Sequence, residues 1–231
     1  TIALSVLNAA TSLAQGKLAL VVGNGAYVHA GRLTNPVNDA EDIAASLKQI
    51  GFEVIVGTDL DKRGFEARVR DFARRLPKAD VALFFYAGHG LQVGGRNVLV
   101  PIDAQLQSER DLDFEGVGLD LILKQMELER ENKTSIVLLD ACRDNPLARN
   151  LAATMGTRST SVGRGLAPAA TGAGTFIAYS TQPGNVALDG AGTNSPFAAA
   201  LARQIRSKGR NLNATMIEVR KDVVAATGGK Q

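Results

Sequence analysis

Short apolar runs along the chain alternate with stretches in which apolar residues recur at helical spacing. The runs predict buried strands over residues 18–24, 52–57, 80–88, 135–141 and 175–181. Helical spacing predicts amphipathic helices over 38–51, 65–76, 118–130 and 195–205, the first capped by Asn38 or Asp39 and ended by Gly51. Residues 92–101 predict a β-hairpin around Gly94 and Gly95.

Strands that alternate with helices indicate right-handed βαβ units. The expected fold class is therefore α/β, with a mainly parallel central sheet and helices on both faces. With 231 residues and 45% hydrophobic content, the chain can bury a full core. A net charge of +3, scattered along the chain, is too small for a phosphate-binding surface, so nucleic acid is excluded as an expected partner.

The first sixteen residues carry no charge and end near Ser12-Leu13-Ala14, a pattern of the kind that signal peptidase cuts. They predict a signal-peptide remnant, with an N-terminal helix packed on the domain as the alternative. A periplasmic or secreted location follows from the first interpretation and a cytoplasmic one from the second. The segment is short for a membrane span. At the other end, residues 228–231 resemble a linker, which suggests that the natural chain continues.

Two reactive side chains follow two of the predicted strands. His89 stands after the third strand, and Cys142, the single cysteine, after the next parallel one. Ligands and chemistry gather beyond the carboxyl ends of parallel strands, so neighbouring strands would bring the two side chains together. An imidazole beside a thiol favours the nucleophilic thiolate. An inert buried cysteine and a hydrogen-bonded histidine are the alternatives for each residue alone.

Residues 23–28, GNGAYV, suggest a dinucleotide-binding loop. The third glycine of that motif is missing, and Gly57 stands where an acidic residue should end the second strand. The sequence therefore favours this interpretation only weakly.

The chain resembles the caspase-like cysteine peptidases, and among them the bacterial orthocaspases and metacaspase-like proteins. The resemblance lies in YAGHG (86–90), in DACRD (140–144), whose cysteine follows His89 by 53 residues, and in AYSTQPG (178–184) followed by SPFAAAL (195–201). It implies a caspase-hemoglobinase fold over residues 17–231. A large-subunit-like part would cover 17–150, a flexible loop 151–172, and a small-subunit-like part 173–231.

The resemblance also implies a mechanism. Cys142 would be the nucleophile and His89 the general acid and base of a cysteine endopeptidase. The N–H groups of Gly90 and Cys142 would hold the oxyanion. A catalytically silent caspase-like module that binds partners or acts in signalling is the alternative.

Carboxylates stand where caspases carry groups that bind an aspartate at P1, the substrate residue before the cleaved bond. Asp140 occupies the place of a glutamine, Asp189 that of an arginine, and Asp39 resembles a metacaspase pocket residue. Such a pocket should prefer Arg or Lys at P1, because an unpaired buried charge is unfavourable. The partner is thus expected to be a peptide or protein substrate with a basic P1 residue. Solvated loop carboxylates, or a helix cap for Asp39, are the alternatives.

Many metacaspases need calcium and carry an acid-rich stretch after the histidine. Residues 91–103 have one carboxylate here, so no cofactor is expected and the sequence does not support a calcium site. The loop that follows Cys142 is rich in Gly, Ser and Thr. If the pocket takes arginine, this loop offers candidate self-cleavage sites at Arg149, Arg158 and Arg164, with an uncut surface loop as the alternative.

Overall fold

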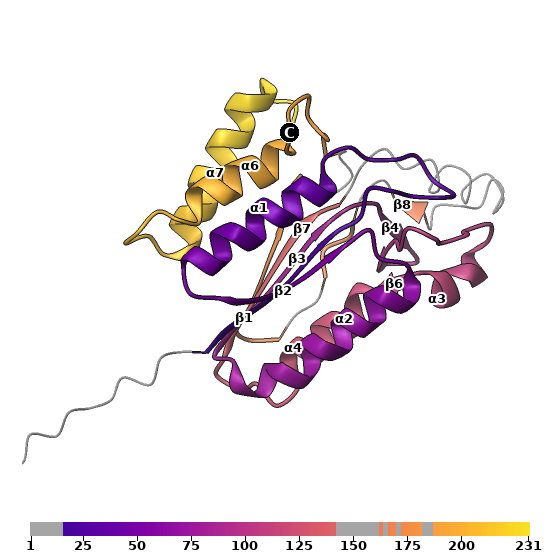
Figure 1. Cartoon of the computed structure of the whole chain (residues 1–231), viewed down its shortest axis with the longest axis horizontal. Coiled ribbons are helices and arrows are strands. Elements are labelled where there is room, and N and C mark those ends of the chain that lie inside the picture. Colours follow the sequence, from indigo (N-terminus) through magenta and orange to yellow (C-terminus); the bar gives the residue numbers. More distant parts are fainter. Residues whose placement is uncertain (1–15, 142–161, 164–165, 170–171, 182–186) are drawn as a thin grey trace, which may run out of the picture.

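A five-stranded parallel sheet forms the centre of the computed structural model, which describes residues 16–141, 162–163, 166–169, 172–181 and 187–231 (Figure 1). The strand order is β2-β1-β3-β7-β9, and all neighbouring pairs are parallel. The strands are β1 (Lys17–Gly23), β2 (Glu53–Thr58), β3 (Val81–Ala87), β7 (Thr134–Asp140) and β9 (Thr175–Tyr179). The α/β class with a mainly parallel sheet is confirmed.

Helices cover both faces of this sheet (Figure 1). Alternate residues of β3 point to opposite faces, so Phe84 packs in one core cluster and Phe85 in the other. One face carries α2 (Lys62–Arg75) and α4 (Leu119–Glu127), and the other carries α1 (Pro36–Gln49), α6 (Pro196–Gln204) and α7 (Leu212–Thr227). The strands are buried on both faces, which explains their nearly continuous apolar runs.

A small antiparallel sheet, of order β6-β5-β4-β8, lies beyond the end of β3. Its strands are β4 (Gly90–Val93), β5 (Arg96–Leu99), β6 (Val117–Gly118) and β8 (Val162–Gly163), and α3 (Leu112–Glu115) precedes β6. The predicted hairpin is confirmed: β4 pairs with β5, and Gly94 and Gly95 turn with φ of +57° and +78°.

Part of the segment expected to be a flexible loop also makes defined contacts. β8 pairs with β4. The backbone N–H and carbonyl of Ala167 both bond to the side chain of Asn97, and the Tyr179 hydroxyl donates to the same carbonyl. The described residues of this segment are therefore held against the small sheet and β9.

One sequence expectation about a helix was wrong, and another helix was not predicted. The first helix begins at Pro36 rather than at residue 38, and its N-cap position is Asn35, so Asn38 and Asp39 do not cap it. Proline at the first helical position needs no hydrogen-bond partner for its nitrogen, which makes this earlier start favourable. Helix α7 was not predicted, although Asn211 caps it through the N–H of Ala214.

The C-terminal residues pack on the domain. Gly228, in a left-handed conformation with φ of +59°, ends α7. The Gln231 side chain then donates to the carbonyl of Ser180 and accepts from the N–H of Leu188.

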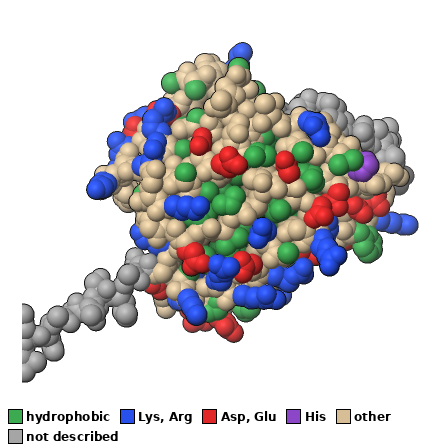
Figure 2. All heavy atoms as spheres, viewed as in Figure 1, with side chains coloured by type: hydrophobic (Ala, Val, Ile, Leu, Met, Phe, Trp, Pro, Cys, Tyr) green, Lys and Arg blue, Asp and Glu red, His purple; other side chains and the backbone are tan. Residues whose placement is uncertain are grey.

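Charges of both signs are interspersed on the surface face shown in Figure 2. That face therefore carries no extended basic field. In the described parts of the chain, no helix has the length and apolar character needed to cross a bilayer.

Candidate active site

The candidate site is built where β3 and β7 end side by side. These strands are parallel neighbours, and Ala87 of β3 lies opposite Asp140 of β7. Just beyond β3, the N–H of Gly88 donates to the carbonyl of Asp140 over 3.3 Å. The sheet thus brings the chain that leads into His89 next to the chain that leads into Cys142.

His89 is almost fully buried, with an exposed fraction of 2%. Its Nε2 lies 2.7 Å from the carbonyl oxygen of Gly31. A carbonyl can only accept, so Nε2 carries the proton in this contact, and in the neutral ring Nδ1 is then the basic nitrogen. The exposed loop that contains Gly31 therefore fixes the tautomer of His89. His29, the other histidine, is exposed.

Gly90, the predicted oxyanion residue, begins β4 and lies close to the end of β7. A Cβ atom added to Gly90 would lie 3.2 Å from the Cβ of Ala141 and 3.1 Å from Cδ2 of Leu166. Ala141 immediately precedes the cysteine. Glycine therefore permits the close approach of the two segments that carry His89 and Cys142.

Several predicted residues lie outside the described part of the chain. They are Cys142, the nucleophile of the expected mechanism, and the candidate self-cleavage residues Arg149, Arg158 and Arg164. Residues 1–15, which hold most of the expected signal-peptide remnant, lie outside it as well.

Two of the predicted pocket carboxylates meet at one serine. Asp39 of α1 and Asp140 of β7 are both fully buried, as is Ser195, the N-cap residue of α6. The N–H of Ser195 donates to Oδ1 of Asp39 over 2.9 Å, and its hydroxyl donates to Oδ2 of Asp140. Two carboxylates that are more than a hundred residues apart in the sequence therefore lie together at the end of β7.

Asp189, the third predicted pocket residue, is half-buried in the loop before α6. Its Oδ2 accepts from the N–H of Thr34 over 3.0 Å, and its carbonyl accepts from the side chain of Asn35. Asn38 also bonds to this loop, through the carbonyl of Thr193 over 3.0 Å. Asp189 thus joins the loop before α6 to the start of α1.

Sequence reasoning missed Ser195. The serine was placed only at the start of a predicted helix, and its signal, Ser followed by Pro at a helix start, is the ordinary signal of an N-cap. The hydroxyl does accept from the N–H of Ala198 over 3.0 Å. Its second role, as donor to a buried carboxylate, depends on tertiary packing that no local pattern reveals.

The dinucleotide alternative conflicts with the contacts of the GNGAYV loop. Oδ1 of Asp59 accepts from the N–H groups of Gly25 and Ala26, both over 2.8 Å. These are the amides that a bound phosphate would use in such a loop. An internal carboxylate already occupies them.

Comparison with protein families identifies the chain. The model of the caspase domain, Peptidase_C14, matches residues 16–231. The chain belongs to the caspase family. Membership implies a cysteine peptidase fold and peptides or proteins as the class of substrate. The narrower resemblance to orthocaspases and metacaspases stays a prediction.

Two mammalian proteins are similar to this caspase-family chain. They are the human mucosa-associated lymphoid tissue lymphoma translocation protein 1 and its mouse homologue. Each is 35% identical over 133 residues, which is 57% of this chain. The alignment spans only 15% of the length of each relative.

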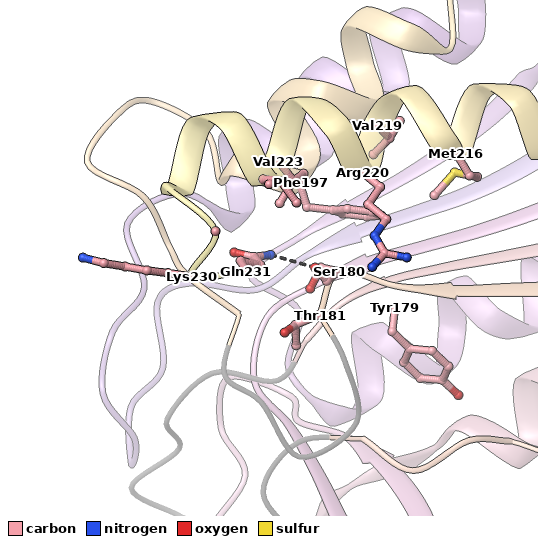
Figure 3. A pocket seen from close by; sticks show the side chains of 12 residues that line it. Tyr179, Ser180, Thr181, Phe197, Met216, Val219, Arg220, Val223, Lys230 and Gln231 are labelled. Atoms are coloured by element: carbon pink, nitrogen blue, oxygen red, sulfur yellow. Dashed lines mark hydrogen bonds between the residues drawn. The ribbon is translucent and has the colours of Figure 1, made fainter.

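A cavity of about 500 Å³ lies between the end of β9 and α7 (Figure 3). Phe197, Met216 and Val219 are among its apolar lining residues, and Gln231 lies in it beside Ser180. None of the predicted site residues that the structure describes lines this cavity. Among the described residues there is also no cluster of three or more His, Cys, Asp or Glu side chains that could hold a metal.

Proposed function

We propose that this caspase-family protein is a cysteine endopeptidase in which Cys142 and His89 form the catalytic dyad. The observation that carries the proposal is the pairing of Ala87 with Asp140 at the ends of neighbouring parallel strands. His89 and Cys142 each follow their member of this pair by two residues. This register supports a close approach of imidazole and thiol.

In the proposed reaction, the Cys142 thiolate attacks the scissile carbonyl and the N–H groups of Gly90 and Cys142 stabilise the oxyanion. His89, holding the proton of the thiol, gives it to the departing amine as the C–N bond breaks. Water, deprotonated by His89, then attacks the thioester. The acid product leaves and the thiol is restored. No metal takes part, and calcium is not required.

We further propose that the substrate carries Arg or Lys at P1. The support is the pair of fully buried carboxylates, Asp39 and Asp140, which both bond to Ser195. Asp140 also precedes Cys142 by two residues. Buried carboxylates favour a cation over an anion, and a guanidinium can bind them through two parallel hydrogen bonds. Asp189 is expected to contribute less, because it is partly exposed and bonded to the backbone of Thr34.

Hydrolysis of a fluorogenic peptide with Arg at P1 tests the dyad. His89→Ala is expected to lower kcat by about 10²- to 10⁴-fold, because the leaving amine loses its general acid. Cys142→Ala should abolish turnover, since the covalent step needs the thiolate. The assay is run with and without excess EGTA, and the two rates should agree.

His29→Ala is the matched control, because it removes the exposed histidine and should leave the rate unchanged. Equal activity of the two histidine variants would overturn the dyad. No hydrolysis by the unmodified protein on any peptide would favour the catalytically silent partner-binding module.

A further inference from the structure

Two of the three tyrosines of the chain come together at His89. Tyr86 is the penultimate residue of β3 and is fully buried, and Tyr27 lies in the loop after β1 with an exposed fraction of 3%. Their hydroxyl oxygens are 3.3 Å apart. Residues from distant parts of the sequence thus place two phenols against the backbone of the candidate catalytic histidine.

Both polar groups of the His89 backbone bond to these phenols. The N–H of His89 donates to Oη of Tyr27 over 2.7 Å. The hydroxyl of Tyr86 lies 2.8 Å from the carbonyl of His89 and 3.1 Å from that of Val100, and donates its proton to either. If Tyr27 donates to Tyr86, the chain of hydrogen bonds begins and ends on His89. The hydrogen bonds of such a chain strengthen one another in a buried environment.

Gly88 shows how closely the phenols pack at this point. A Cβ atom added there would lie 2.6 Å from Oη of Tyr27 and 2.6 Å from Oη of Tyr86, which is closer than real contacts allow. The φ of Gly88 is +156°, a value at which a side chain is also strained. The glycine before His89 therefore leaves room for the two hydroxyl groups.

Tyr27 also contacts the imidazole itself. The two rings are 4.4 Å apart between centroids and tilted by 45°. Nε2 of His89 also bonds to the carbonyl of Gly31, which lies in the same loop as Tyr27. The ring of His89 is thus held by one loop through a packed face and a hydrogen bond, while the phenols hold its backbone.

We propose that Tyr27 and Tyr86 are positioning residues that fix His89 for proton transfer. The effect on hydrolysis rests on the proposed function, because it requires His89 to be the general acid. A general acid must lie within hydrogen-bond reach of the leaving amine, and a displacement of about 1 Å can lower the rate by about 10²-fold. Phenylalanine at either position would keep the ring but leave a backbone group of His89 without its phenol partner.

Tyr27→Phe and Tyr86→Phe test the role of the hydroxyl groups alone. Each is expected to lower kcat on an Arg-P1 peptide by about 10- to 100-fold and to change KM by less than about 2-fold. The double variant should lose little more than either single one, because both phenols belong to one hydrogen-bond chain. Measuring all three also covers the case in which one variant fails to fold.

Ser135→Ala is the matched control for the loss of a buried hydroxyl. Ser135 lies at the opposite end of the sheet, where its hydroxyl donates to the carbonyl of Met126 over 3.1 Å. Ser135→Ala and the tyrosine variants should all lower the melting temperature by a few degrees. Only Ser135→Ala should leave kcat unchanged.

NMR of the protein labelled with ¹⁵N-histidine gives a measurement that does not depend on activity. With only two histidines, the exposed His29 serves as the internal reference. In the Cys142→Ala background, where no thiol gives its proton to the ring, neutral His89 should show one tautomer, with the proton on Nε2, and this signal should broaden or become a mixture in the Phe variants. An unchanged His89 spectrum with unchanged kcat would overturn the positioning role. A changed spectrum in a protein that hydrolyses no peptide would retain the positioning role and reject the proposed function.

Discussion

The two ends of the central sheet both bury ionisable side chains, but they hold them in different ways. At the amino end, Arg130 is 4% exposed and its guanidinium donates to four backbone carbonyls, those of Leu76, Ala79, Met126 and Thr134. At the carboxyl end, Asp39 and Asp140 are fully buried and meet at Ser195. One end buries a guanidinium among backbone carbonyls, and the other buries two carboxylates that both bond to Ser195, one through its N–H and one through its hydroxyl.

This difference separates a structural role from a candidate functional one. The carbonyls around Arg130 belong to the turn before β3, the last turn of α4 and the start of β7, so the guanidinium joins three elements. Burial lowers the pKa of this guanidinium, an effect that Asp80 opposes. The carboxylates at the other end present charge beside the strand that leads into Cys142. A buried carboxylate can select a cationic substrate, whereas a guanidinium bonded to backbone carbonyls stabilises the fold.

The largest effect on stability is expected from Arg130→Met. The substitution keeps much of the apolar stem but leaves several buried carbonyls without a donor, which should lower the free energy of unfolding by about 3 kcal/mol. Urea denaturation measures the loss. The activity of the folded fraction should be unchanged at all P1 residues, and a selective loss for Arg-P1 peptides would mean that the two ends are coupled.

Asp140→Asn should lower activity on Arg-P1 peptides and leave stability nearly unchanged, the opposite of Arg130→Met. It removes a charge from the proposed pocket but keeps an oxygen that can accept from Ser195. The expected result is a fall of about 10- to 100-fold in kcat/KM for Arg-P1 peptides, with a change in the free energy of unfolding below about 1 kcal/mol. Steady-state kinetics and urea denaturation of the same preparation provide both values.

Asp222→Asn is the control for the loss of one negative charge. Its carboxylate bonds to Gln204 and Arg203 on the adjacent helix, which lowers its pKa, and it has no described contact with the proposed pocket. Selectivity should be unchanged in this variant. Asp189→Asn should give an effect smaller than that of Asp140→Asn, and equal effects at Asp140, Asp189 and Asp222 would indicate a general electrostatic influence rather than a pocket.

The sequence predicted the sheet well because its strands are buried on both faces and form short apolar runs. It failed at α7, in which Val, Ile and Thr are frequent and the apolar face is weakly defined. The signals were present at the helix ends, where Asn211 and Gly228 are typical capping residues. The start of α1 was misplaced because Asn38 and Asp39 looked like caps, yet both bond to the segment before α6.

The candidate site was less predictable than the fold. His89 and Asp140 could be named because they lie in recognisable motifs next to strand ends. The partners that hold them could not, because Ser195 is 55 residues from Asp140 and Tyr27 is 62 residues from His89. Such contacts arise from strand order and helix packing, which one sequence specifies only through the folded structure.

A scan of P1 residues with the unmodified protein tests the central claim most directly. Fluorogenic peptides that differ only at P1 are compared by kcat/KM, with Cys142→Ala as the blank. The proposed function predicts that Arg is cleaved best, Lys next, and Asp poorly or not at all. Faster cleavage after Asp than after Arg would contradict the assignment of Asp39 and Asp140 to the substrate pocket.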